Sequence, residues 1–186
     1  MHFCTFVIID PKGDPESLVA KSLALFSEDL EVPPYKVYLN DFDIRMMAEQ
    51  YKLKPHDRHA LAKHMHDWMN RPGGVDRQGL YYTTTCNPHG HWDWYEIGGR
   101  WNRYIKGARR NVISTKALLK SPHLEGRLPC YVVTPDGTWL EHERFVSVGS
   151  LGGKIKTKPD TAWLREVTNA LKKHPDSRVV CVDIHH

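Results

Sequence analysis

Two short and nearly continuous apolar runs, residues 3–9 and 179–184, lie near the two ends of this 186-residue chain. Runs of this length, rich in Val and Ile and bounded by turn residues, are typical of buried β-strands. Each of these strands must find partners, so the two runs constrain the fold more than any other feature. We therefore predict a sheet that contains both ends of the chain.

The residues between the two runs alternate between helical and extended patterns. Asp14 followed by Pro15 marks the start of an amphipathic helix, because Asp is a favoured N-cap and Pro is favoured at the first helical position. Residues 31–75 contain two further helical patterns after the stop at Pro33-Pro34, and they are predicted to form a helical insertion. Further elements are expected at residues 80–85 (strand), 114–119 (helix), 130–134 (strand) and from residue 160 (helix).

Without the insertion, the predicted order of elements is β-α-β-β-α-β. This is the split βαβ pattern of ferredoxin-like α+β folds, so the sequence predicts a single α+β domain over residues 1–186 with the insertion inside it. In that topology the first and last strands are antiparallel neighbours, and the start of one lies beside the end of the other. We therefore expect His2 and His185 to be close in space.

Composition excludes several classes of protein. Hydrophobic residues make up 40% of the chain and no apolar run reaches about 18 residues, so neither a disordered nor a membrane-spanning protein is expected. The formal net charge of +4 is too small to indicate nucleic-acid binding by itself. The four cysteines form no Cys-x-x-Cys pair and the N-terminus lacks a basic leader, so we predict a cytoplasmic protein with reduced thiols.

Residues 91–101 hold the densest group of chemically useful side chains. Trp and Tyr offer flat surfaces for stacking, paired glycines permit close backbone approach, and Arg suits a phosphate or a carboxylate. Together they predict a pocket for a planar, anionic ligand such as a nucleotide. The alternative is that the aromatic residues belong to the core and that Asp93 and Arg100 form a structural ion pair. The candidate ligand-binding residues are Trp92, Trp94, Tyr95, Gly98, Gly99, Arg100 and Trp101.

A second group lies on the final strand. Cys181, Asp183 and His185 alternate along it and share one face, and His2 can join them from the first strand. A histidine beside a carboxylate suits proton transfer near neutral pH. The alternative is a solvated outer face of the sheet. The candidate catalytic residues are His2, His185, Asp183 and Asp93. Their spacing matches no metal-site motif, and neither a metal nor another cofactor is predicted.

Basic residues follow the aromatic segment directly. Their alternation with Trp and Tyr is typical of surfaces that stack on bases and contact phosphates, although a solvated basic surface gives the same pattern. The residues are Arg100, Arg103, Lys106, Arg109 and Arg110.

These residues resemble a family of small phage and prophage proteins of unknown function. The resemblance is carried by His2-Phe3, by residues 92–101, by Asp136-Gly137 with Trp139, and by Val182-Asp183 with His185. It spans both ends and the middle of the chain, and its central segment is the most specific part. The resemblance implies a phage-encoded cytoplasmic protein. Because the motif residues coincide with the two groups above, it also implies that they form one composite site.

The leading functional hypothesis is an enzyme that acts on a nucleotide or nucleic acid. It would use the aromatic and Arg residues as a pocket, with a His/Asp pair as acid and base. Two alternatives use the same cluster without catalysis. One is an interaction protein, such as a phage inhibitor of a host defence factor or nuclease, and the other is a nucleotide-binding sponge. A nucleotide, a nucleic acid or a host protein is therefore the expected partner, and no membrane is expected.

Overall fold

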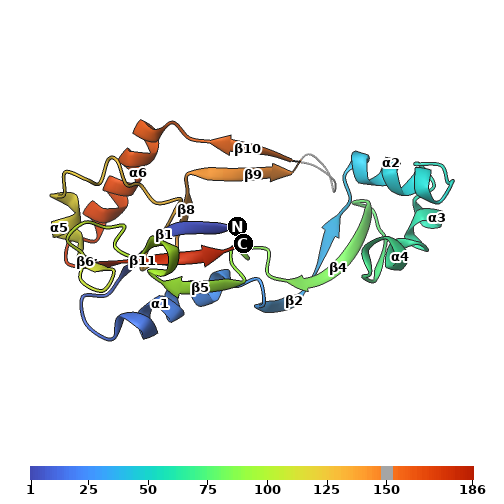
Figure 1. The fold of residues 1–186 in the computed structure, drawn as a ribbon. Helices are drawn as coiled ribbons and strands as arrows, with labels where there is room; N and C mark the ends of the chain where they lie inside the picture. Colours follow the sequence, from blue (N-terminus) through green and yellow to red (C-terminus); the bar gives the residue numbers. More distant parts are fainter. Residues whose placement is uncertain (148–152) are drawn as a thin grey trace. The chain divides into compact units, whose positions relative to one another are not determined.

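The computed structural model describes residues 1–147 and 153–186, with the backbone alone at 145–147 and 153–154. The protein is α+β, and its chain divides into two compact units (Figure 1). Unit 1 comprises Met1–Leu30, Asn87–Arg144 and Lys156–His186, and unit 2 comprises Glu31–Cys86 and Phe145–Ile155. The single domain expected from the sequence is thus built as two units. In the described part of the chain, no helix combines the length and the apolar character needed to cross a bilayer.

Unit 1 contains the predicted first and last strands. Its first helix begins where expected, because the Asp14 carboxylate accepts a hydrogen bond from the Ser17 N–H at 2.8 Å. Its elements are β1 (His2–Ile9), α1 (Pro15–Leu23), β5 (Trp94–Ile97), β6 (Val112–Ser114), α5 (Thr115–Leu119), β7 (Tyr131–Val133), β8 (Trp139–Glu141), α6 (Asp160–Lys173) and β11 (Arg178–His185), with short 3₁₀ helices η1 (Ala24–Phe26) and η2 (Gly99–Trp101). A hairpin of β9 (Glu143–Ser147) and β10 (Gly153–Thr157) spans the boundary in sequence between the units.

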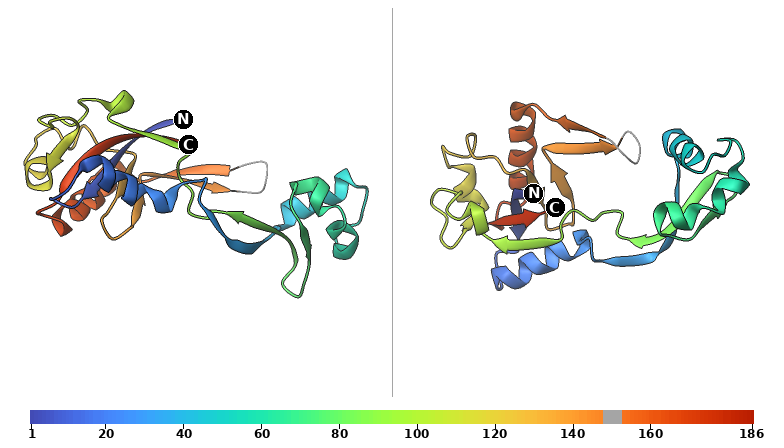
Figure 2. Two further views of the ribbon diagram at one scale, coloured as in Figure 1. Left: turned by 90° about the horizontal axis from the view of Figure 1, so that it is seen from below. Right: turned by 45° about the vertical axis from the view of Figure 1, so that its right-hand side comes forward.

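The strands of unit 1 form a mixed sheet in the order β5-β11-β1-β7-β8, with β6 also paired to β11. β1 and β11 are antiparallel along their whole length, and His2 lies directly opposite His185, as predicted. β7 runs parallel to β1 on its other side. The chain ends lie side by side in all three views (Figures 1 and 2), and the backbones of Met1 and His186 are hydrogen-bonded to each other.

Both faces of this sheet are buried. Alternate residues of β1, such as Phe6 and Val7, belong to two separate cores, one packed under α6 and the other under α1. The alternative of a solvated outer face on the last strand does not hold for Cys181 and Asp183, which are both buried. Cys181 belongs to the core under α6 together with Ile105, and Asp183 is covered by Gly99 and the backbone of Arg100.

One buried hydroxyl in β1 gives a stability prediction. Thr5 is 0% exposed, and its Oγ1 has no hydrogen-bond partner among the described residues. Thr5→Val should therefore stabilise the protein by about 1 kcal/mol, because it removes an unsatisfied polar atom at constant shape. Urea unfolding measures this change. Thr115→Val is the matched control, since its buried hydroxyl donates to the Ser177 carbonyl at 2.7 Å and its loss should destabilise by about 1 kcal/mol. Equal effects in the two variants would contradict the prediction.

Unit 2 is a small sheet covered by helices. Its elements are β2 (Glu31–Tyr38), α2 (Asp41–Gln50), α3 (Arg58–Ala62), α4 (Met65–Met69), β3 (Gly73–Val75) and β4 (Leu80–Cys86), and its strand order is β2-β4-β3. The unit has its own core, formed by Ile44, Met47, Ala48, Leu61, Met65 and Leu80.

The insertion differs from the prediction in two ways. It continues to Cys86 and contains a sheet as well as helices, because β4, expected as a strand of the main sheet, pairs with β2 instead. Pro33-Pro34, read as a stop, lies within β2. Both prolines are tolerated there because β2 is an edge strand with an irregular register between Glu31 and Tyr35.

Candidate functional site

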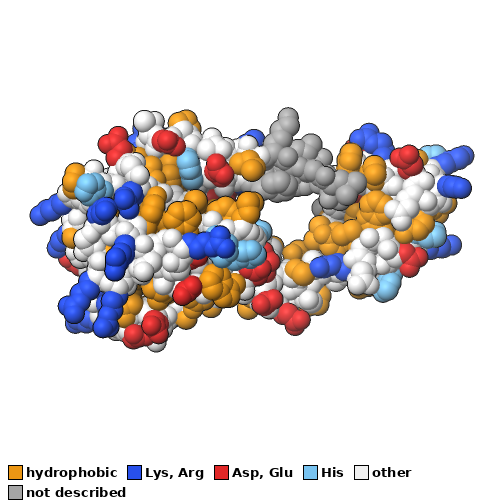
Figure 3. Space-filling view, in the orientation of Figure 1, with side chains coloured by type: hydrophobic (Ala, Val, Ile, Leu, Met, Phe, Trp, Pro, Cys, Tyr) orange, Lys and Arg blue, Asp and Glu red, His pale blue; other side chains and the backbone are white. Residues whose placement is uncertain are grey.

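The adjacent ends of β1, β11 and β5 place three rings in one row across the sheet. His2 lies opposite His185, and His185 lies opposite Trp94, so all three side chains project from the same face. The His2 ring centroid is 5.1 Å from that of His185 and 5.8 Å from that of Trp94. Figure 3 shows histidine side chains at the surface where the two chain ends meet. The two histidines predicted to be close therefore do meet.

A buried carboxylate holds the first histidine. Asp183 is 1% exposed, and its Oδ1 lies 3.1 Å from the His2 Nδ1. Its Oδ2 accepts a hydrogen bond from the backbone N–H of Arg100 at 3.0 Å. With both oxygens engaged, this carboxylate can fix the orientation and tautomer of the His2 ring. The sequence indicated a role for the side chain of Arg100 in ligand binding, whereas the contact with Asp183 is made by the backbone N–H of Arg100.

Two glycines bring that N–H to the carboxylate. Gly98 and Gly99 have φ values of +78° and +46°. A Cβ on Gly99 would lie 2.6 Å from the Asp183 Oδ2, and a Cβ on Gly98 would lie 2.2 Å from the Asn111 Nδ2. The close approach predicted at these glycines is thus made to Asp183 and Asn111. The Gly-Gly pair is the sequence signal that could have located this support for the site.

Gly99→Ala should therefore destabilise the protein by about 2–4 kcal/mol and detach Arg100 from Asp183. The cost combines a positive φ with a clash against a buried side chain. Gly107→Ala is the matched control, because Gly107 has a φ of +81° and nothing lies within 4 Å of its added Cβ. The control should cost only about 1 kcal/mol. Thermal or urea unfolding measures both variants, and similar costs would show that Gly99 is not needed for the approach.

The second histidine has a carboxylate partner of its own. The His185 Nδ1 lies 2.8 Å from the Asp93 Oδ1, and the Asp93 N–H donates to the His185 carbonyl at 3.1 Å. The hydrogen bond with His185 lowers the pKa of Asp93. Both side chains are partly exposed, at 39% and 47%. The ion pair between Asp93 and Arg100, considered from the sequence, does not occur in the described part of the chain, because Asp93 turns to His185.

The aromatic residues of the central segment separate instead of forming one stack. Trp92 and Tyr95 pack on the core under α1, where the Trp92 Nε1 donates to the Leu23 carbonyl at 2.9 Å. Trp101 packs on the opposite core, beside Tyr104. Only Trp94, at 46% exposure, stands beside the histidines. The sequence prediction of one pocket lined by all these rings was therefore wrong for Trp92, Tyr95 and Trp101, because alternation along β5 and the turn after it send them to different cores.

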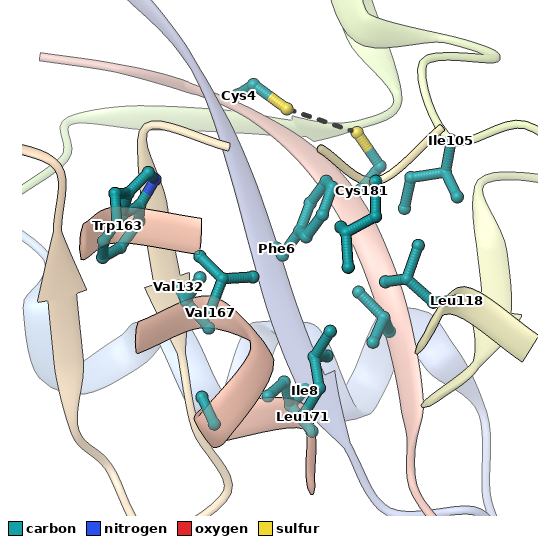
Figure 4. Packing of buried hydrophobic residues seen from close by; sticks show 13 residues of the cluster. Cys4, Phe6, Ile8, Ile105, Leu118, Val132, Trp163, Val167, Leu171 and Cys181 are labelled. Atoms are coloured by element: carbon teal, nitrogen blue, oxygen red, sulfur yellow. Dashed lines mark hydrogen bonds between the residues drawn. The ribbon is translucent and has the colours of Figure 1, made fainter. Parts of the chain in front are cut away.

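Two buried thiols lie directly behind the site. The Sγ atoms of Cys4 and Cys181 are 3.8 Å apart and belong to the core that also holds Phe6 (Figure 4). The hydrogen bond between the thiols, together with burial, raises the pKa of Cys4. Cys4 lies opposite Asp183 in the β1–β11 pair, so the two thiols border the buried carboxylate. Among residues 1–147 and 153–186, no group of three or more His, Cys, Asp or Glu side chains is arranged to hold a metal ion.

A further histidine in the segment is a packing residue. The His91 ring stacks on Trp139 with centroids 4.5 Å apart. Burial, with smaller contributions from His186 and His89, lowers the pKa of His91 to about 4. The sequence offered no signal for this role beyond the position of His91 beside a turn.

The lowered pKa of His91 predicts a pH dependence of stability. Between about pH 6.5 and pH 4 the unfolded chain binds a proton that the folded ring refuses, so the free energy of unfolding should fall as pH falls through this window. After allowance for partial exposure, we expect a loss of about 1–2 kcal/mol. His91→Phe keeps a ring against Trp139 but cannot titrate, so its curve of stability against pH should lack this loss. Parallel curves for the two proteins would contradict the assignment.

Comparisons with family models, curated proteins and solved structures find no match to this chain.

Proposed function

We propose that the protein is an enzyme that acts on a nucleotide or nucleic acid, with His2 and His185 as its acid and base. The observation that supports it most strongly is the pair of imidazoles 5.1 Å apart, each with a carboxylate on Nδ1 at 3.1 or 2.8 Å. The two His–Asp pairs combine residues from both ends of the chain with Asp93 from the loop before β5. Packing of the core does not require such polar pairs.

The chemistry follows from which ring nitrogen is occupied. A carboxylate on Nδ1 favours the tautomer with its hydrogen on that atom, which leaves Nε2 to exchange protons with a substrate. One Nε2 would remove the proton of an attacking water or sugar hydroxyl. The other, protonated, would give its proton to the leaving oxygen or base. One ring gains a proton and the other loses one, so the total charge of the enzyme is unchanged. Exchange of protons with solvent then restores the starting protonation states of the two rings.

The residues next to the histidines suit a nucleotide. Trp94 exposes 46% of its surface beside His2, and an exposed indole can stack on a base. The Arg100 side chain is exposed while its backbone is held on Asp183, so its guanidinium is available to a phosphate. The proposed bond is therefore a phosphate ester or a glycosidic bond, placed between Trp94 and Arg100.

A rate measurement as a function of pH tests this proposal. Purified protein is assayed against RNA, single-stranded DNA, cyclic and linear nucleotides and nucleosides, with the products separated by mass. We expect turnover of one of these classes with a bell-shaped pH profile, because the reaction needs one group as base and another as acid. Turnover that survives unchanged in the double variant H2N/H185N would overturn the proposal, as would the absence of turnover in all classes.

The exposure of Trp94 also favours a second candidate, an interaction protein. Exposed Trp and Arg residues, here Trp94 and Arg100, are enriched in binding hot spots, which suits a phage inhibitor of a host defence factor or nuclease. A nucleotide-binding sponge would use the same residues. Tight binding without turnover distinguishes both of these candidates from the enzyme. An inhibitor would bind a host protein, and the Trp94→Ala variant would lose that binding. A sponge would retain a nucleotide without modifying it.

The origin, compartment and detailed fold type belong to the same proposal. The four free thiols support a reducing compartment such as the cytoplasm, in keeping with the phage resemblance. A ferredoxin-like split βαβ arrangement is supported by the antiparallel pairing of the first and last strands, β1 and β11. The parallel pairing of β1 with β7, and the packing of α1 and α6 against opposite faces of the sheet, depart from that arrangement.

A further inference from the structure

A basic strip lies on the chain between β5 and β6, next to the site. The segment between Glu96 and Glu125 contains no acidic residue, and the first half of this segment contains five basic residues. All five are exposed: Arg100, Arg103, Lys106, Arg109 and Arg110. Figure 3 shows Lys and Arg side chains gathered over β6 and the chain between β5 and α5, in the same view as the histidines.

The sheet fixes the two ends of this strip. β5 and β6 pair with the same edge of β11, at residues 182–185 and 178–180 respectively, and between them the chain folds over the core under α6, where Ile105 is buried. Trp94 lies opposite His185 and Val112 lies opposite Val180. Five residues of extended strand separate these positions, which corresponds to roughly 17 Å. Several successive phosphates would cover this length, but a single nucleotide would not.

At the far end of the strip, a tight turn lies beside a cleft. The cleft has a volume of about 460 Å³, and Arg109, Arg110 and Arg178 line it together with Asp14 and Glu16. Arg178 donates to backbone carbonyls, and the Asp14 carboxylate caps α1, so both groups are already engaged. Arg109 and Arg110 have no ion pair among the described residues.

Arg110 holds an unusual backbone conformation in this turn. The Arg109 N–H donates to the Val112 carbonyl and the Val112 N–H donates to the Arg109 carbonyl, each at 3.0 Å. The two central residues of the turn, Arg110 and Asn111, have φ values of 50° and 62°. Turns with two positive φ values favour Asn and Gly. Asn111 fits this rule and Arg110 does not. A strained arginine on a tight turn at a cleft is a reason to look for a ligand.

We propose that the substrate is a single-stranded polynucleotide whose backbone runs from Arg100 along this strip to Arg109 and Arg110. This inference rests on the proposed function, which places the reacting bond of the polynucleotide at His2 and His185. The strand is single because the exposed indole of Trp94 can stack on an unpaired base, whereas the bases of a duplex are stacked on one another. Phosphates along the strip would be held by charge, without reading of sequence.

Fluorescence anisotropy with labelled oligonucleotides of about 12 nucleotides tests this inference. The protein carries H2N, which prevents turnover during the titration. Removing two phosphate contacts with R109Q/R110N should reduce the slope of log affinity against log salt by about 1.4 and weaken binding at low salt at least tenfold. Asn at position 110 suits the positive φ, so the variant should fold at least as well. K172Q/K173Q removes the same charge from the exposed end of α6 and should leave the slope unchanged.

Three results would overturn the inference: equal slopes in the two double variants, tighter binding of duplex than of single strand, or equal competition by a mononucleotide. They are separate from failure of the proposed function. Turnover of small nucleotides with unaltered oligonucleotide binding in R109Q/R110N would support the enzyme and refute the strip. If the protein with both histidines intact turns over nothing, and R109Q/R110N still abolishes oligonucleotide binding, the strip is supported and the enzyme is refuted.

Discussion

Asp183→Asn is expected to lower kcat by roughly 10²–10⁴-fold while leaving substrate binding nearly intact. The amide has the size of the carboxylate and can still accept the hydrogen bond from the Arg100 N–H. It can also donate to the His2 Nδ1, which would force the ring hydrogen onto Nε2 and remove the lone pair that faces substrate. The variant thus changes a tautomer with little change in shape.

Steady-state kinetics on the substrate found in the screen above measure this effect. Asp93→Asn is the matched control: its partner His185 is more exposed, so water can replace the lost contact and the fall in kcat should be smaller. A rise in KM with unchanged kcat in Asp183→Asn would show that the carboxylate supports binding and not proton transfer. An equal fall in kcat in the two variants would contradict the prediction that the buried carboxylate matters more than the exposed one.

Trp163→Ala is expected to have the largest effect on stability, about 3–5 kcal/mol. Trp163 is 0% exposed in the core under α6, and its Nε1 donates to the Pro129 carbonyl at 2.7 Å. The His142 ring stacks on it at 5.7 Å, and the Lys158 Nζ lies 5.3 Å from its ring centroid. Truncation would leave a cavity, an unpaired carbonyl and two unsupported side chains.

Urea unfolding followed by circular dichroism measures this change, since the substitution itself alters fluorescence. Trp94→Ala is the control, because an indole exposed at 46% on the sheet edge should contribute no more than about 0.5 kcal/mol. The two tryptophans thus differ in role: one stabilises the core and the other belongs to the site. Comparable losses in the two variants would contradict that division.

The pairing of the chain ends could be predicted from the sequence because buried strands leave few choices. Apolar runs at residues 3–9 and 179–184 had to enter one sheet, and the structure pairs His2 with His185 as expected. The two His–Asp pairs follow from this register. Asp183 shares a face with His185 on the same strand, and Asp93 precedes the residue opposite His185.

The rest depended on tertiary packing that local patterns do not encode. The composition of residues 91–101 indicated a site, but the pairing of β5 with β11 decides that Trp94 is exposed while Tyr95 faces a core. The direction of Trp101 depends on the turn after β5, which Gly98 and Gly99 form against Asn111 and Asp183. The strand at residues 80–85 was predicted as a strand, yet its partner β2 contains two prolines, so its place in unit 2 was missed. Burial of Cys181 was missed because the covering segment around Ile105 has no regular pattern.

The most direct test of the acid–base site is the tautomer of its two histidines. Two-dimensional ¹⁵N–¹H NMR of labelled protein at about pH 9, where an ordinary histidine is neutral, identifies which ring nitrogen carries the hydrogen. The contacts of Asp183 and Asp93 predict the hydrogen on Nδ1 in both His2 and His185, and transfer of the His2 hydrogen to Nε2 in Asp183→Asn. Both rings with the hydrogen on Nε2 in the unaltered protein would contradict the account, because neither lone pair would then face substrate.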